Sequence, residues 1–104
     1  MKKAYLDLIK YALNNKALIS VWDGEEWQVK MSTSYKEVKD AVESVEMAWM
    51  KLRQWPDGNS NLPSEVIGSV TVIPHDVEPE ETVADFSVTP FLTEWDRQYS
   101  GETA

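Results

Sequence analysis

His75 and Asp76 form the one pair of neighbouring side chains in this sequence that suggests acid–base catalysis. A general base acts only on a proton within hydrogen-bond reach, and nucleophilic catalysis needs a serine, cysteine or lysine beside the base. Side chains of adjacent residues usually point apart, and the sequence indicates no nucleophile next to His75. The chain also has no cysteine, which excludes thiolate nucleophiles, disulfides and cysteine metal sites. We therefore expect His75 to be a solvated loop residue, and we expect no catalytic residues and no enzymatic activity.

Five carboxylates lie close together in the sequence after His75 and could in principle hold a hard cation. They are Asp76, Glu78, Glu80, Glu81 and Asp85. The cluster lacks the glycine-centred spacing of a calcium-binding loop, and Pro79 stiffens its middle. The four glycines of the chain also stand too far apart to cradle a phosphate. We expect no metal and no cofactor, so the cluster is either a solvated charge run or a surface for a basic partner.

Two of the five tryptophans, Trp22 and Trp27, flank the turn signal Asp23-Gly24. In a sheet with one covered face, one of the two could pack inside while the other lies on the open face. Trp and Tyr are the most frequent anchors of protein interfaces, although burial in a small core is the commoner role of a single Trp. The candidate partner-binding residues are therefore Trp22, Trp27, Asp76, Glu78, Glu80, Glu81 and Asp85.

Charge is distributed unevenly along the 104 residues, which carry 18 acidic and 10 basic side chains for a net charge of −8. Residues 1–52 are neutral, with eight acids and eight lysines. Residues 53–104 hold ten acids and only two arginines, so this half carries the whole net charge. Nucleic acid and anionic membranes repel an acidic chain, and no apolar run is long enough to span a bilayer. We expect no direct nucleic-acid binding, no membrane binding and a cytoplasmic location.

The elements that must position these residues begin with a helix over residues 2–15, where apolar side chains recur at helical spacing. Residues 17–22 are rich in β-formers, and residues 26–31 alternate between polar and apolar side chains. With Asp23-Gly24 between them, these two segments predict a hairpin. On its second strand, one face would carry Trp27, Val29 and Met31.

A second helix is predicted to begin at Tyr35, because Ser34 with Glu37 three residues later forms a capping-box pattern. Two interpretations of the following segment stay open. The apolar rhythm could continue a single helix of about 20 residues, or residues 47–54 could form a strand. We favour the strand, because the next clear strand, at residues 66–73, needs a partner. On that strand Ala48, Met50 and Leu52 would share one face, and Trp49, Lys51 and Arg53 the other.

The last third of the chain is predicted to contain a polar, proline-broken loop over residues 75–81. Residues 82–87 follow as a short strand or an unpaired extended segment. Thr89 and Pro90 are typical of a helix start, and Ser100-Gly101 predicts where that helix ends.

The fold class predicted by these elements is α+β, as a single domain with an antiparallel four-stranded sheet and helices in the order α-β-β-α-β-β-α. Residues 55–63, which are dense in turn formers, would connect the third and fourth strands. The domain is expected to span residues 1–101, with residues 102–104 as a frayed C-terminal tail.

Two short motifs stand out beside these elements: VWDGEEWQVKMSTS at residues 21–34 and VADF at residues 83–86. They resemble segments of small acidic accessory proteins encoded by bacteriophages and prophages, most of which are uncharacterised. The resemblance spans residues 17–95, and relative to it residues 55–66 look like an insertion. It implies a protein that acts by binding a host or viral protein, and it transfers no functional residue to this chain.

Three functions follow as hypotheses. We favour a non-catalytic module that binds a basic surface of a host or viral protein, in one version as a nucleic-acid mimic that inhibits a defence or nucleic-acid enzyme. The second is a structural phage subunit, a homodimer or larger homo-oligomer, that assembles through exposed tryptophans and open sheet edges. The third is a small enzyme built on paired carboxylates.

Overall fold

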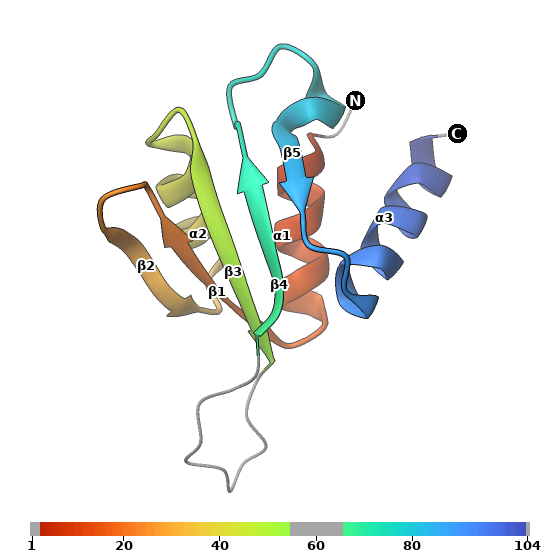
Figure 1. Ribbon diagram of the computed structural model, residues 1–104, viewed down its shortest axis with the longest axis horizontal. Coiled ribbons are helices and arrows are strands. Elements are labelled where there is room, and N and C mark those ends of the chain that lie inside the picture. The colour runs from red at the N-terminus through yellow and green to blue at the C-terminus, as the bar shows by residue number, and fades with distance from the viewer. Residues whose placement is uncertain (1–2, 55–65, 104) are drawn as a thin grey trace, which may run out of the picture.

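Five antiparallel strands form the sheet on which the fold is built (Figure 1). The computed structural model describes residues 3–54 and 66–103. The elements in chain order are α1 Ala4–Asn14, β1 Ala17–Trp22, β2 Trp27–Ser32, α2 Tyr35–Glu43, β3 Ala48–Gln54, β4 Val66–Val72, the 3-10 helix η1 Pro79–Thr82, β5 Val83–Phe86 and α3 Pro90–Thr103. Across the sheet the strands stand in the order β2-β1-β3-β4-β5. The α+β class is confirmed, whereas the prediction of four strands was wrong.

The additional strand is β5, the segment for which an unpaired extended conformation was the alternative. It pairs with β4, with Phe86 opposite Val70 and Asp85 opposite Thr71. Four residues are too few to give a readable period of two in the sequence. A contact with another element stabilises the strand instead, because Phe86 packs edge to face on Trp95 of α3 with ring centroids 5.9 Å apart. Tertiary packing, more than local propensity, makes this strand.

The helices α1 and α2 cover one face of the sheet and leave the other open, while α3 lies on the β5 side and packs against β4 and α1 (Figure 1). The core between helices and sheet draws on both. The helices contribute Ala4, Tyr5, Leu8, Ile9, Ala12, Val38, Val42, Leu92, Trp95 and Tyr99. The strands contribute Ala17, Ile19, Val21, Val29, Ala48, Met50, Leu52, Val70 and Val72. Because the helices cover one face only, large apolar side chains on the opposite face stay in contact with solvent.

β3 confirms the strand interpretation of residues 47–54. Ala48, Met50 and Leu52 are buried beneath the helices, and Trp49 between them is exposed. β3 pairs with β1 on one side and β4 on the other, which makes it the central strand of the sheet. The predicted connection after it, including the expected insertion, lies outside the described residues.

β2 departs from the predicted alternation, so the expectation that Trp27, Val29 and Met31 share a face was wrong. Val21 stands opposite Val29 whereas Trp22 stands opposite Trp27, so β2 advances two residues where β1 advances one. A second irregularity follows, and Met31 there has a φ of +49°. Such bulges insert an extra residue and re-aim the side chains around it. As a result Val29 is buried, while Trp27 and Met31 are exposed.

The helix starts follow the capping patterns in the sequence. Ser34 Oγ accepts a hydrogen bond from the N–H of Glu37 at 3.3 Å, at the start of α2. At the start of α3, Thr89 Oγ1 accepts from the N–H of Leu92, also at 3.3 Å. The predicted end of the last helix at Ser100-Gly101 was wrong, since α3 continues beyond it.

A buried hydroxyl and a carboxylate tie α1 to α2. Tyr5 is buried and its OH donates to Glu43 Oε2, while Lys39 Nζ lies 2.9 Å from Glu43 Oε1. Burial, and after it the bonded carboxylate, raises the pKa of Tyr5 above its ordinary 10.0. Burial alone would raise the pKa of Glu43, but the hydrogen bonds from Tyr5 and Lys39 outweigh it and hold that pKa below 4.5.

Tyr5→Phe is expected to lower the free energy of unfolding at pH 7 by about 1.5 kcal/mol, because it removes a hydrogen bond to a charged group. The bonded carboxylate of Glu43 contributes to the free energy of unfolding at pH values above its ordinary pKa. This contribution is lost as the pH falls through the lowered pKa. The contribution of Tyr5 is present below about pH 10 and is lost as the pH rises, because the unfolded chain ionises first. In urea unfolding across the pH range, the free energy of unfolding of Tyr5→Phe should therefore depend less on pH than that of wild type, at both the acid and the alkaline end. Tyr35→Phe, which removes the same atom from a half-buried ring, is the control, and equal changes in both variants would contradict the assignment.

Candidate binding surface

One row of side chains crosses all five strands on the face that the helices leave open. The strand registers place Trp22 opposite Trp27 on one side and Trp49 on the other. Thr71 stands opposite Trp49 and also opposite Asp85. The row thus runs from three indoles on β2, β1 and β3, through a hydroxyl on β4, to a carboxylate on β5. We call Trp22, Trp27 and Trp49 the Trp cluster.

A groove of about 590 Å³ lies over this row. The Trp cluster, with Lys51 beside it, forms one wall and residues 85–87 form the other, with Ser69 and Thr71 on the floor between them. Because β3 and β5 are two strands apart, the backbones that carry Trp49 and Asp85 lie about 10 Å from each other. The floor is fixed to the β5 wall, since Ser87 Oγ accepts from the N–H of Ser69 at 3.0 Å and its own N–H donates to Ser69 O at 2.9 Å.

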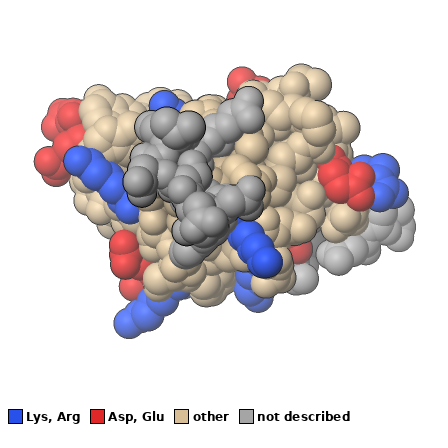
Figure 2. Space-filling view, turned by 90° about the horizontal axis from the view of Figure 1, so that it is seen from below, with Lys and Arg blue, Asp and Glu red and all other residues tan. Residues whose placement is uncertain are grey.

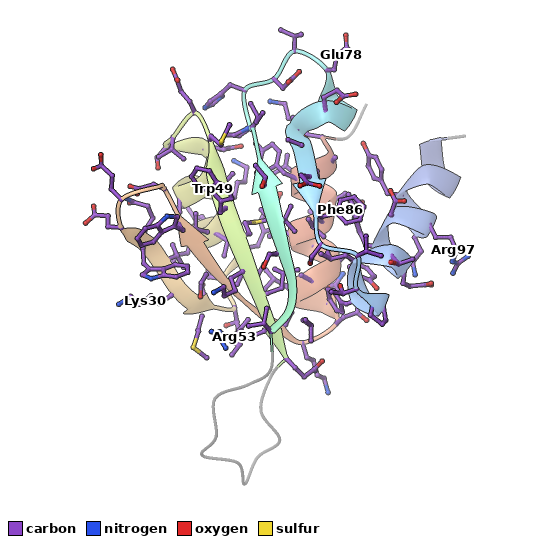
Figure 3. All side chains as sticks on the ribbon, viewed as in Figure 1. Lys30, Trp49, Arg53, Glu78, Phe86 and Arg97 are labelled. Carbon is purple, nitrogen blue, oxygen red and sulfur yellow. The ribbon has the colours of Figure 1, made fainter. Side chains whose placement is uncertain are left out.

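The three indoles are held in place but only partly covered. Trp22 and Trp27 pack edge to face with ring centroids 5.1 Å apart, and the ammonium of Lys51 lies 5.8 Å from the Trp27 ring centroid. Trp49 lies against the β1–β2 turn, where a Cβ added to Gly24 would be 3.4 Å from its ring (Figure 3). Trp27 and Trp49 are each 38% exposed. Exposed aromatic surface of this kind marks an interaction site more often than an isolated surface residue does.

Three acidic connections gather at the end of the sheet beside this row. The β1–β2 turn, the segment between α2 and β3 and the β4–β5 connection all lie there, because neighbouring strands are antiparallel. Figure 3 shows Glu78 at this end. Among the side chains that the structure describes, they bring seven carboxylates, which we call the acidic end: Asp23, Glu25, Glu26, Glu46, Asp76, Glu78 and Glu81. Four of them come from the electrically neutral half of the sequence.

Two carboxylates of the acidic end also shape their own turns. Asp23 Oδ1 accepts from the backbone N–H groups of Glu25 at 2.7 Å and Glu26 at 2.8 Å. The backbone bonds, first that of Glu26 and then that of Glu25, lower the pKa of Asp23. In the β4–β5 connection Asp76 Oδ1 accepts from the N–H of Glu78 at 2.9 Å. These bonds hold the acidic connections in defined conformations.

Among the described residues, Lys3 and Lys39 reach the acidic end, and other cations lie toward the opposite end. Lys3 Nζ donates to a backbone carbonyl of the β4–β5 connection at 3.4 Å, and Lys39 is ion-paired with Glu43 at 2.9 Å. Lys30 and Arg53 lie toward the other end of the sheet (Figure 3). Figure 2 looks at that end and shows Lys and Arg side chains at several places among carboxylates. The end opposite the acidic end therefore carries charges of both signs.

The predicted partner-binding residues meet at one end of the molecule in two groups. Trp22, Trp27 and Asp85 line the groove, and Asp76, Glu78, Glu80 and Glu81 belong to the β4–β5 connection beyond it. Reasoning from the sequence missed Trp49 and Lys51 as groove residues. The signal was present, because the alternation over residues 47–54 places both on the face away from the core.

His75 lies outside the groove, and its Nε2 is 3.0 Å from the backbone oxygen of Glu43. Within residues 3–54 and 66–103, no three side chains form a group that could hold a metal ion. In the same residues, no helix combines the length and the apolar character needed to span a membrane. The groove itself offers indole faces, hydroxyl groups and one carboxylate, which suit the binding of a flat or cationic group. No protein-family model, curated protein or solved structure matches this chain.

Proposed function

We propose that this chain is a non-catalytic binding module that engages a basic surface of another protein through the groove and the acidic end beside it. One observation carries the proposal. Trp27 and Trp49 stay 38% exposed on the sheet face opposite α1 and α2, in the row of residues next to the seven described carboxylates of the acidic end.

The two parts of this surface would contribute differently to binding. Indoles that become buried at the centre of an interface are among the residues whose truncation costs the most affinity. Carboxylates around them add long-range attraction and speed association with a basic partner, an effect that salt weakens. An apolar centre with a polar rim is also the common arrangement of protein interfaces.

In one form of this proposal, the acidic end occupies a groove that otherwise binds DNA or RNA. Proteins bind nucleic acid by neutralising phosphates with Lys and Arg. Carboxylates held in turns and in the β4–β5 connection can stand in for those phosphates. The chain would then act as an inhibitor, and nucleic acid would compete with it for the partner.

Assembly with copies of itself is the alternative, and the sheet edges support it less than they support a different partner. β2 is bulged twice, and β5 has only four residues. Bulges and short edge strands both hinder the addition of a further strand. The exposed indoles favour either function, so the state of association in solution separates the two.

The double variant Trp27→Ser/Trp49→Ser is expected to bind the partner at least about 30-fold more weakly, because it removes two interface anchors. The partner is the protein that the immobilised chain retains from a bacterial lysate at about 50 mM salt and releases at about 500 mM. Its affinity for the purified chain would then be measured by calorimetry. Val66→Thr changes an apolar residue of similar exposure, 41%, on β4 outside the groove, and should leave the affinity unchanged.

Three outcomes would contradict the proposal. The first is unchanged affinity of the double variant, and the second is a retained protein without a basic surface. The third is a wild-type chain that sediments as a dimer and a double variant that sediments as a monomer, which would favour assembly with copies of itself.

A further inference from the structure

We propose that the groove receives an arginine side chain of the partner, whose guanidinium stacks on the Trp cluster and pairs with Asp85. This inference rests on the proposed function and makes it more specific, because it names the group that the basic surface must present. The argument comes from three features of the groove: an indole wall that already attracts a cation, a carboxylate on the facing wall, and a floor of small polar side chains.

The indole wall already attracts a cation within the chain. The Lys51 ammonium lies 5.8 Å from the Trp27 ring centroid, within the range of a cation–π interaction. Among the described residues, no second aromatic ring and no ammonium is placed against Trp49, which is 38% exposed. A planar guanidinium stacks on such a ring better than an ammonium does, because it is less strongly hydrated.

The facing wall supplies the countercharge. Asp85 is exposed, and its Oδ1 accepts from the N–H of Phe86 at 2.9 Å. Its Oδ2 has no hydrogen-bond partner within residues 3–54 and 66–103. A guanidinium presents several N–H donors in one plane, so it can stack on an indole and still pair with a carboxylate at its edge. The spacing of about 10 Å between the strands of Trp49 and Asp85 leaves room for one such group.

The floor and the surroundings decide which kind of ligand fits. Ser69 and Thr71 are small, so the groove stays open between its walls. Their hydroxyl oxygens can accept hydrogen bonds from further N–H groups of a guanidinium. An anionic ligand would find the single cation Lys51, but it would also meet Asp85 and the acidic end. Charge complementarity therefore selects a cation, and the flat shape of the wall selects arginine among cations.

The test uses the full chain and two blocked synthetic peptides, tetra-arginine and tetra-lysine, at low salt. Binding is followed by tryptophan fluorescence, and the perturbed residues are located by NMR from the indole and backbone N–H signals. Wild type is expected to bind the arginine peptide at least about 5-fold more tightly than the lysine peptide. Asp85→Asn should weaken binding of the arginine peptide about 5-fold. Asp96→Asn, which makes the same charge change on α3 outside the groove, should weaken it less than about 2-fold.

Lys51→Met is a variant in which affinity for the arginine peptide is expected to rise instead of fall. It removes a like charge from beside the Trp cluster and frees the Trp27 ring, so the arginine peptide should bind about 3-fold more tightly. Weaker binding in Lys51→Met would overturn the proposal, because a guanidinium on the Trp cluster cannot lose affinity when a like charge beside it is removed. Equal losses in Asp85→Asn and Asp96→Asn would also overturn it, since they indicate diffuse attraction only.

The two proposals fail in different ways. If both peptides perturb the groove signals equally, arginine selectivity is wrong while a basic partner at this surface still stands. If neither peptide perturbs the groove or the acidic end, both proposals are wrong.

Discussion

Trp95→Ala is expected to lower the free energy of unfolding by about 4 kcal/mol, since truncating a buried aromatic side chain removes its packing and leaves a cavity. Trp95 is 2% exposed and links three elements. Its ring stacks on Tyr99 at 5.4 Å between centroids and meets Phe86 of β5 edge to face. Its Nε1–H donates to Asp7 Oδ2 of α1 at 2.9 Å. Through these contacts Trp95 fastens α3 to both α1 and β5.

Urea unfolding followed by circular dichroism measures this loss, with Trp95→Phe expected to lie between wild type and Trp95→Ala. Thr93→Ala, at an exposed position of the same helix, is the control and should stay within about 0.5 kcal/mol of wild type. The Asp85 wall of the groove depends on β5, so amide exchange in β5 should rise in Trp95→Ala before exchange in β1 or β3 does. A loss below about 1.5 kcal/mol would contradict the view that α3 is fastened through this ring.

Gly68→Val is expected to cost about 3 kcal/mol, because it forces new atoms into a filled core. Gly68 lies on β4 opposite Leu52, with Leu92 of α3 above it. A Cβ at this position would lie 2.6 Å from Leu92 Cδ1 and 2.9 Å from Leu92 Cγ. Contacts this short require Leu92 and the helix that carries it to shift. An isolated glycine within a strand often marks such a close approach, so the sequence itself contained the signal.

A double-mutant cycle tests the cause of this loss. Gly68→Ala and Leu92→Ala should each destabilise the chain, and together they should destabilise it less than the sum of the two, because the smaller side chain makes room for the new methyl group. Ser69→Ala, at the next residue on the open face, should change stability by less than about 0.5 kcal/mol. Strict additivity of the two core variants would place the strain somewhere other than the contact with Leu92.

The parts of the fold that the sequence predicted are those whose signals are local. The first helix, the hairpin, the cap at Ser34 and the strand at residues 47–54 each follow from spacing within a few residues. The bulges of β2 were missed, because a pattern of alternate residues does not show where the register against β1 slips. β5 was left between two interpretations, because its pairing depends on Phe86 meeting Trp95, a contact between separate elements.

The candidate surface was predicted in its residue types but not in its arrangement. Trp22 and Trp27 were identified from the turn they flank, and that turn did bring them together. The grouping of these indoles with Trp49 and Asp85 needs the registers of four strand pairs, which no local pattern contains. In the same way, Glu25 joins Asp76 and its neighbours only because antiparallel pairing returns three connections to one end.

Carboxylates gather at one end of the sheet, and Lys30 and Arg53 lie toward the other, an arrangement that adds a component along the strands to the dipole moment of the molecule. The backbone dipoles of antiparallel strands nearly cancel. The ionised side chains therefore set the direction of this component of the dipole moment. In the field of a positively charged body the molecule would rotate before contact, so the indole-bearing end would arrive first. Orientation during the encounter would then raise the fraction of productive collisions without any added contact.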